Sequence, residues 1–131
     1  MNISVSPNNP VPLYQQIVDQ IKAKILSGEL QPGGSLPSMR QLAEELLASV
    51  ITTKRAYSEL EREGLIITRP GLGAFVADLS GDTVERVKTE LVAGHLRAAV
   101  KSSRELGIAD DQVIRMLREM LRGSLGGRRD E

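Results

Sequence analysis

The sequence predicts a mainly α fold with a small β-hairpin, in which a winged helix-turn-helix is followed by a two-helix dimerisation element. Three observations predict this fold. Two short segments with helical apolar spacing are joined by about three residues, as a helix-turn-helix requires. Two short β-type runs around a Pro/Gly turn follow directly. The remaining chain contains two further amphipathic helices.

The first helix is expected to run from about Pro12 to Ser27, after a polar, extended lead-in over residues 1–10. Proline suits a first helical turn, because its missing N–H would have no partner there. The wide apolar face of this helix comprises Leu13, Tyr14, Ile17, Val18, Ile21 and Ile25. Gly28 is expected to end the helix in the left-handed conformation, and Glu29–Leu36 is expected to be a connector rich in turn residues.

Two serines are expected to begin the next two helices. Ser38 with Gln41 three residues later forms a capping-box pattern, and Ser49 is placed to cap the third helix. The inner face of the second helix comprises Met39, Leu42, Ala43 and Leu46, and that of the third Thr53, Ala56, Tyr57 and Leu60. Gly64 is expected to end the third helix.

The hairpin is expected to pair residues 65–68 with residues 74–77 across the turn Arg69–Gly73. A long helix is then expected from about Thr83 to Leu106, with Asp82 as its cap and Gly107 at its end. A last helix is expected to begin at Asp110 or Asp111, and residues 123–131 are predicted to form a flexible tail.

Composition excludes several classes of function. The 131 residues carry 17 basic and 17 acidic side chains, so a surface that binds nucleic acid must depend on where the charges lie. The chain has no Cys, and its single histidine, His95, has no acidic neighbours at ligand spacing, so no metal site is expected. We find no nucleophile or phosphate-binding motif, and therefore expect neither enzyme activity nor a cofactor.

The predicted location is cytoplasmic, with no membrane contact. No apolar run approaches the roughly 20 residues that span a bilayer. The first ten residues have neither the basic leader nor the apolar core of a signal peptide.

Four segments together resemble the GntR family of bacterial regulators. They are PLYQQI from Pro12, SGELQPGGSLPSMRQLA from Ser27, TTKRAYSELEREGLI from Thr52 and GLGAFV from Gly71. The remaining helical part is too short for a large effector-binding domain. Its segment ELGIADDQVIRMLREML, from Glu105, is similar to the two-helix dimerisation tail of the YtrA-like subfamily.

The resemblance implies a regulator, in particular a repressor, whose third helix enters the major groove of double-stranded DNA while its wing touches the backbone. It places Arg40, Thr52 and Lys54 at DNA contacts and Gly71 and Gly73 in the wing. Independently of the family, Ile51, Lys54 and Arg55 share a face opposite the predicted core, where an apolar side chain could meet a thymine methyl. The expected DNA-binding residues are Ser38, Arg40, Ser49, Ile51, Thr52, Lys54, Arg55, Arg69, Gly71 and Gly73.

Residues 1–78 are thus predicted to be the DNA-binding domain and residues 82–122 the dimerisation element. The two C-terminal helices cannot bury their apolar stripe alone, so a second copy of the chain is the expected partner. The expected dimer contacts are Val84, Val87, Leu91, His95, Ala98, Val113, Leu117 and Met120.

Three positions depart from the usual family pattern and leave alternatives open. Leu47 replaces the turn glycine, Val50 an arginine, and Leu72 the basic residue between the wing glycines. The loss of two cations, with zero net charge, leaves open one alternative, a winged-helix protein-interaction module with little DNA affinity. A sensor that binds an unidentified small-molecule effector between the tail helices is another. For Arg40, the alternative to a phosphate contact is a salt bridge to Glu44.

Overall fold

The computed structural model describes residues 1–128, and the surroundings of side chains up to residue 123. Its elements are α1 (Leu13–Leu26), α2 (Met39–Leu46), α3 (Val50–Arg62), β1 (Ile66–Arg69), β2 (Gly73–Val76), α4 (Gly81–Leu106) and α5 (Asp110–Arg128). The chain divides into two compact units after Val84, within the first turn of α4.

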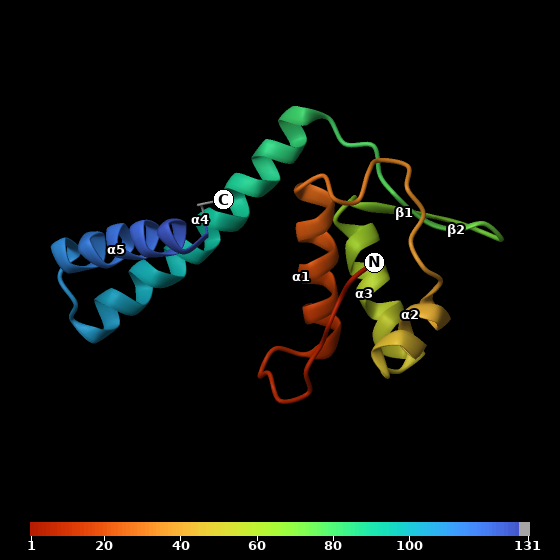
Figure 1. Ribbon diagram of the computed structural model, residues 1–131, viewed down its shortest axis with the longest axis horizontal. Helices are drawn as coiled ribbons and strands as arrows, with labels where there is room; N and C mark the ends of the chain where they lie inside the picture. Colours follow the sequence, from red (N-terminus) through yellow and green to blue (C-terminus); the bar gives the residue numbers. More distant parts are fainter. Residues whose placement is uncertain (129–131) are drawn as a thin grey trace. The chain divides into compact units, whose positions relative to one another are not determined.

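Helix α3 is the centre of the first unit, because it packs against both α1 and α2 (Figure 1). The predicted inner face of α3 is buried, and so is most of the predicted face of α1. Tyr57 also holds the connector in place, since its hydroxyl donates to the Pro37 carbonyl at 2.7 Å. Burial, together with the Glu45 carboxylate, raises the pKa of Tyr57 above its ordinary value, so the hydroxyl keeps its proton.

The predicted caps of α2 and α3 are confirmed. The Ser38 hydroxyl accepts the Gln41 amide at 3.0 Å while the Gln41 side chain accepts the Ser38 amide, which completes the capping box. At α3, the Ser49 hydroxyl accepts the Thr52 amide, also at 3.0 Å. These caps fix where each helix starts, and therefore which residues lie in the first turn of α3.

The turn between α2 and α3 contains an unusual backbone conformation. Leu47, the C-cap of α2, has φ +55° and ψ +38°, the left-handed region. Among the described residues it is the one non-glycine with a positive φ. Its side chain is 93% exposed, so no packing within the chain offsets the backbone cost.

The hairpin has the predicted order and a simple antiparallel register, with Ile66 opposite Val76 and Arg69 opposite Gly73. The connector before α2, predicted over Glu29–Leu36 as a segment rich in turns, also pairs with β2. Its Gly33 and Leu36 amides donate to β2 carbonyls at 2.8 and 2.9 Å, and Ser35 bridges Phe75. The connector therefore runs along the second edge of β2 and ties the wing to the helices.

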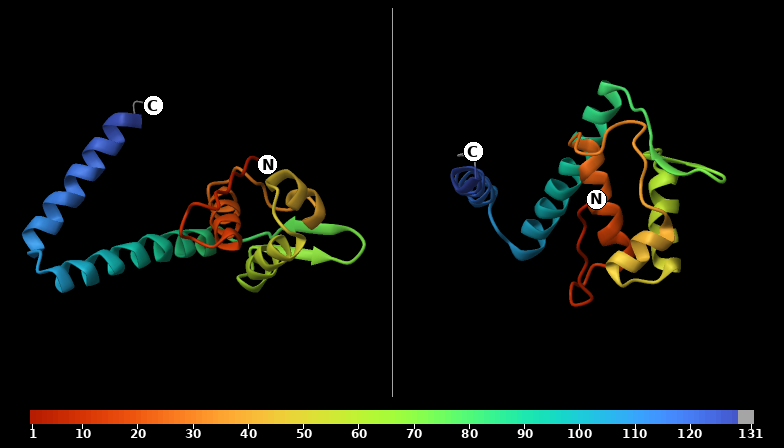
Figure 2. Two further views of the ribbon diagram at one scale, coloured as in Figure 1. Left: turned by 90° about the horizontal axis from the view of Figure 1, so that it is seen from below. Right: turned by 45° about the vertical axis from the view of Figure 1, so that its right-hand side comes forward.

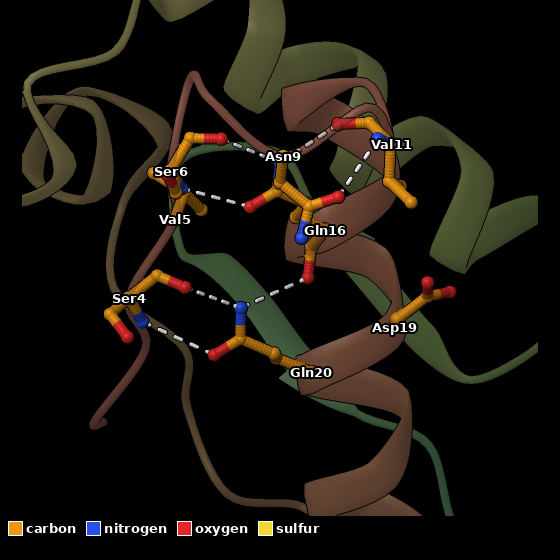
Figure 3. A pocket seen from close by; sticks show the side chains of 8 residues that line it. All are labelled: Ser4, Val5, Ser6, Asn9, Val11, Gln16, Asp19 and Gln20. Carbon is orange, nitrogen blue, oxygen red and sulfur yellow. Dashed lines mark hydrogen bonds between the residues drawn. The ribbon is translucent and has the colours of Figure 1, made fainter.

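The lead-in segment is bound to α1 by two glutamines (Figure 3). The Gln16 side chain accepts the Ser6 amide and donates to the carbonyls of Ser6 and Val11. Gln20 exchanges two hydrogen bonds with the backbone of Ser4, of 3.2 and 2.7 Å. Gln16 is buried, and its amide satisfies backbone groups of a segment without secondary structure.

The C-terminal unit consists of α5 and most of α4. The cap of α4 is Ser80 and not Asp82 as predicted, because the Ser80 hydroxyl accepts the Thr83 amide at 3.1 Å. Asp82 instead lies in the first turn, where a carboxylate favours the helix dipole. Gly107 ends α4 at φ +71°. Helix α5 begins at Asp110 and continues to Arg128, past Gly123 where the flexible tail is predicted to begin; residues 129–131 of that prediction lie outside the described part.

The two helices of this unit diverge from the loop that joins them, as the left view of Figure 2 shows. They are linked beside the loop, where the Arg104 guanidinium lies 2.7 Å from an oxygen of Asp110. Ser103 is buried there, and its hydroxyl donates to the Val100 carbonyl. Further along, most of the apolar side chains of both helices are exposed within one chain.

Candidate nucleic-acid interface

The outward face of α3 carries the predicted contact residues Ile51, Lys54 and Arg55, and all three are exposed. Ile51 is 80% exposed and its neighbour Val50 40%, although both are aliphatic. The opposite face of the helix forms the core, so Ile51 and Lys54 are directed away from the protein. The structure thus agrees with the predicted division of α3 into a buried inner face and an exposed outer face.

The basic residues near this face differ in what they contact. Arg40 is exposed in the first turn of α2, and the ion pairs of the described residues do not include one between Arg40 and Glu44. Arg55 instead stacks on α1, with its guanidinium carbon 3.8 Å from the centroid of the Tyr14 ring. This contact was not foreseen from the sequence, since nothing local links residues 41 positions apart.

The acidic residues of α3 and its C-cap Glu63 lie toward the C-terminal end of the helix, and each has a partner within the chain. Glu63 lies 2.6 Å from the Lys22 ammonium. The Glu61 carboxylate accepts from the amide and the hydroxyl of Thr68 at 3.3 and 3.1 Å. The Arg62 guanidinium holds the pKa of Glu59 at about 2, well below its ordinary value.

Three hydroxyl residues on the predicted DNA-binding face have structural roles in the free chain. Ser38 and Ser49 are the caps of α2 and α3. The Thr52 side chain is half-buried, and its hydroxyl lies 2.9 Å from that of Ser49. Thr52 therefore stabilises the start of α3, in addition to any contact with a base.

The wing presents the exposed residues Arg69, Gly71, Leu72 and Gly73. Gly71 and Gly73 have φ of +76° and +112°, and an added Cβ would meet no atom within 4 Å at either. The glycines are therefore required by backbone conformation and not by lack of room. Leu72, at the tip, is 72% exposed, and its amide donates to the Arg69 carbonyl at 2.9 Å.

The predicted dimer contacts are mainly exposed in one chain. Leu91, His95, Ala98, Leu117 and Met120 are exposed, while Val84, Val87 and Val113 are half-buried. Helix α4 also carries Val92, Leu96 and Val100 beside the predicted dimer contacts, at positions that widen the apolar stripe of the sequence, and Val92 is 58% exposed against 37% for Leu91. The spacing of four in the sequence was the signal for these three residues.

The described residues also bear on metal binding and membrane insertion. No cluster of three or more His, Asp or Glu side chains there could hold a metal ion. None of the described helices combines the length and the apolar character needed to cross a membrane.

Comparison with known proteins decides the family. Residues 13–76 match the family model of "Bacterial regulatory proteins, gntR family". The chain is 30% identical over 129 residues to the HTH-type transcriptional repressor YtrA of Bacillus subtilis, which covers 98% of this chain and 99% of YtrA. The chain belongs to the gntR family. The predicted family, with its YtrA-like character, is therefore confirmed, and so is the function class of transcription regulator.

Solved gntR-family structures agree with the fold. A GntR family transcriptional regulator from Listeria monocytogenes superposes with a TM-score of 0.74 at 28% identity, over 86% of this chain and 97% of that one. The DNA-binding domain of AraR in complex with an operator superposes with a TM-score of 0.52 at 27% identity, over 56% and 94%. The predicted fold class, a winged helix-turn-helix followed by two helices, is confirmed.

Proposed function

We propose that this gntR-family chain is a sequence-specific repressor that binds an inverted-repeat operator as a homodimer. The observation that carries the proposal is the outer face at the start of α3. There Ile51 and Lys54 project from a helix whose other face forms the core, and Arg40 is exposed in the first turn of the neighbouring helix α2. In a helix-turn-helix, the second helix, here α3, is the one that enters the major groove.

The proposed roles follow from position. Arg40, at the start of α2, and Arg69, in the wing, would contact phosphates, which set register without reading sequence. Ile51 and Lys54, in the first turns of α3, would contact base edges. Arg55 stacks on Tyr14 of α1, so we assign it to the margin of the interface.

Binding titrations with the full chain test these roles. A duplex selected from a random-sequence pool is compared with an unrelated duplex at one salt concentration. Arg40→Ala should weaken both complexes by similar factors and flatten the log–log salt slope by about one per subunit. Ile51→Ala should weaken only the selected duplex. Arg62→Ala, a matched loss of an exposed cation at the far end of α3, should change neither.

The selected sequences also test the dimer. Two-fold symmetry predicts an inverted repeat with half-sites about 34 Å, or a multiple, apart. If the pool yields no enriched sequence, the proposal is wrong and the protein-interaction alternative is favoured. A selected site without a dyad would contradict the homodimer alone.

The apolar faces of α4 and α5 support dimerisation, because a soluble chain gains by covering them with a second copy. Light scattering of the full chain should give twice 14.3 kDa. Leu117→Glu should shift the mass toward the monomer, while the control Arg115→Glu, on the same helix, should not. A monomeric wild-type chain at micromolar concentration would refute this part of the proposal.

A further inference from the structure

The first turn of α3 exposes two adjacent aliphatic side chains, Val50 and Ile51, directly after the cap Ser49. Elsewhere on this helix the apolar residues Ala56, Tyr57 and Leu60 are fully or almost fully buried. Val50 leaves 40% and Ile51 80% of its surface exposed, so both contribute less to the core than these three residues. The pair lies in the first turn of the second helix of the helix-turn-helix, the part of this motif that meets base edges when it binds DNA.

The surroundings of the pair favour DNA as the covering partner. Lys54 lies on the next turn of the same face, and Arg40 is exposed at the start of the neighbouring helix. The first six residues of α3, VITTKR, contain no acid, whereas the acids of this helix follow and are paired within the chain. An apolar spot beside cations fits the major groove, where base edges lie between two rows of phosphates.

Aliphatic side chains have neither donor nor acceptor, and this restricts what they can recognise. The apolar group in the major groove is the C5-methyl group of a pyrimidine, which thymine and 5-methylcytosine carry and cytosine lacks. We infer that Val50 and Ile51 read a pyrimidine C5-methyl group in each operator half-site. This inference rests on the proposed function and adds the chemistry by which one base position is selected.

Uracil substitution tests the inference, because it removes the methyl group of thymine and keeps every hydrogen bond of the base pair. In the duplex selected from the random pool, each thymidine is replaced singly by deoxyuridine and titrated with the full chain. At one or two positions per half-site, the loss should be about fourfold per methyl group, the value expected for burying one such group. Substitution in both half-sites should give a loss of about fifteenfold.

The protein variants identify the side chains responsible. The affinity for the thymine duplex divided by the affinity for the uracil duplex measures how strongly the methyl group is recognised. Val50→Ala or Ile51→Ala should reduce this affinity ratio at the sensitive position. Arg40→Ala should weaken binding to both duplexes but leave the affinity ratio unchanged. Both aliphatic side chains are exposed, so circular dichroism should show the wild-type helix content. In a second arm, 5-methylcytosine at the sensitive position should bind more tightly than cytosine by the same factor.

Four outcomes would overturn the inference. Uniform tolerance of uracil, or a ratio that survives in both aliphatic variants, would refute methyl recognition while leaving the proposed repressor intact. Failure of 5-methylcytosine to improve on cytosine would likewise refute it. Failure of the wild-type chain to enrich any sequence would refute both the methyl recognition and the proposed function. This failure would be seen in the selection itself, before any uracil is introduced.

Discussion

Replacing Leu47 by glycine should stabilise the N-terminal unit. Leu47 has φ +55°, a conformation that costs an L-residue about 1–2 kcal/mol relative to glycine. Because the side chain is 93% exposed, its removal forfeits almost no burial. Glycine adds about 0.4–1 kcal/mol of conformational entropy to the unfolded chain. With mid-range values for both terms, the net gain in the free energy of unfolding is about 0.5–1 kcal/mol.

Thermal unfolding followed by circular dichroism measures this gain. In a cooperative unit of the size of residues 1–84, each kcal/mol of added stability raises the Tm by about 4–8 °C. The expected gain should therefore raise the Tm by about 2–8 °C. Leu47→Ala is the matched control, because alanine loses the same exposed side chain but keeps the Cβ that causes the strain. Its Tm should stay near that of the wild type.

Two results would refute this reasoning. A lower Tm for Leu47→Gly would mean that the leucine side chain makes a stabilising contact, for example in the dimer. An equal rise for Leu47→Ala would mean that the side chain, and not the backbone conformation, is the source of the cost.

Three further predictions concern contacts inside the N-terminal unit. Tyr57→Phe should lower the free energy of unfolding in urea by about 1–2 kcal/mol at unchanged m value, because the Pro37 carbonyl loses its donor; no change would contradict the anchoring role. Gln16→Ala should speed amide hydrogen exchange at Ser6, whereas Gln15→Ala, whose side chain bonds only Asp19, should not. The pKa of Glu59 is lowered to about 2, so its contribution to stability is present above the ordinary pKa and is lost as the pH falls toward 2. Glu59→Gln should therefore flatten the decline of Tm between pH 4.5 and 2; an unchanged slope would show that the Arg62 contact does not persist in solution.

The features predicted correctly from the sequence depend on neighbours in the chain. The caps at Ser38 and Ser49 and the ends near Gly28 and Gly107 follow from residues within one or two helical turns. The inner face of α3 follows from its helical period alone. A short stretch of sequence contains all the residues that determine such a feature, because the interactions that produce it act between residues close together in the chain.

The features missed depend on chain segments that meet only after folding. Stacking of Arg55 on Tyr14 requires α1 and α3 to pack, and the pairing of Gly33 with Val76 requires the connector to return to the wing. Nothing in either segment marks its partner. The cap of α4 was missed for another reason, since Ser80 and Asp82 are both good cap residues, and backbone geometry chose between them.

The zero net charge of the chain is no measure of its affinity for DNA. Net charge governs the field far from the protein, but salt screens that field beyond about 8–10 Å. A docked duplex responds instead to the charges within a few ångströms. On α3 these are separated by position, because Lys54 and Arg55 lie in the N-terminal half while Glu59, Glu61 and Glu63 lie in the C-terminal half with their own internal partners. Replacing Glu59, Glu61 and Glu63 by neutral residues should therefore change the rate at which the protein is steered toward DNA more than it changes the affinity of the docked complex.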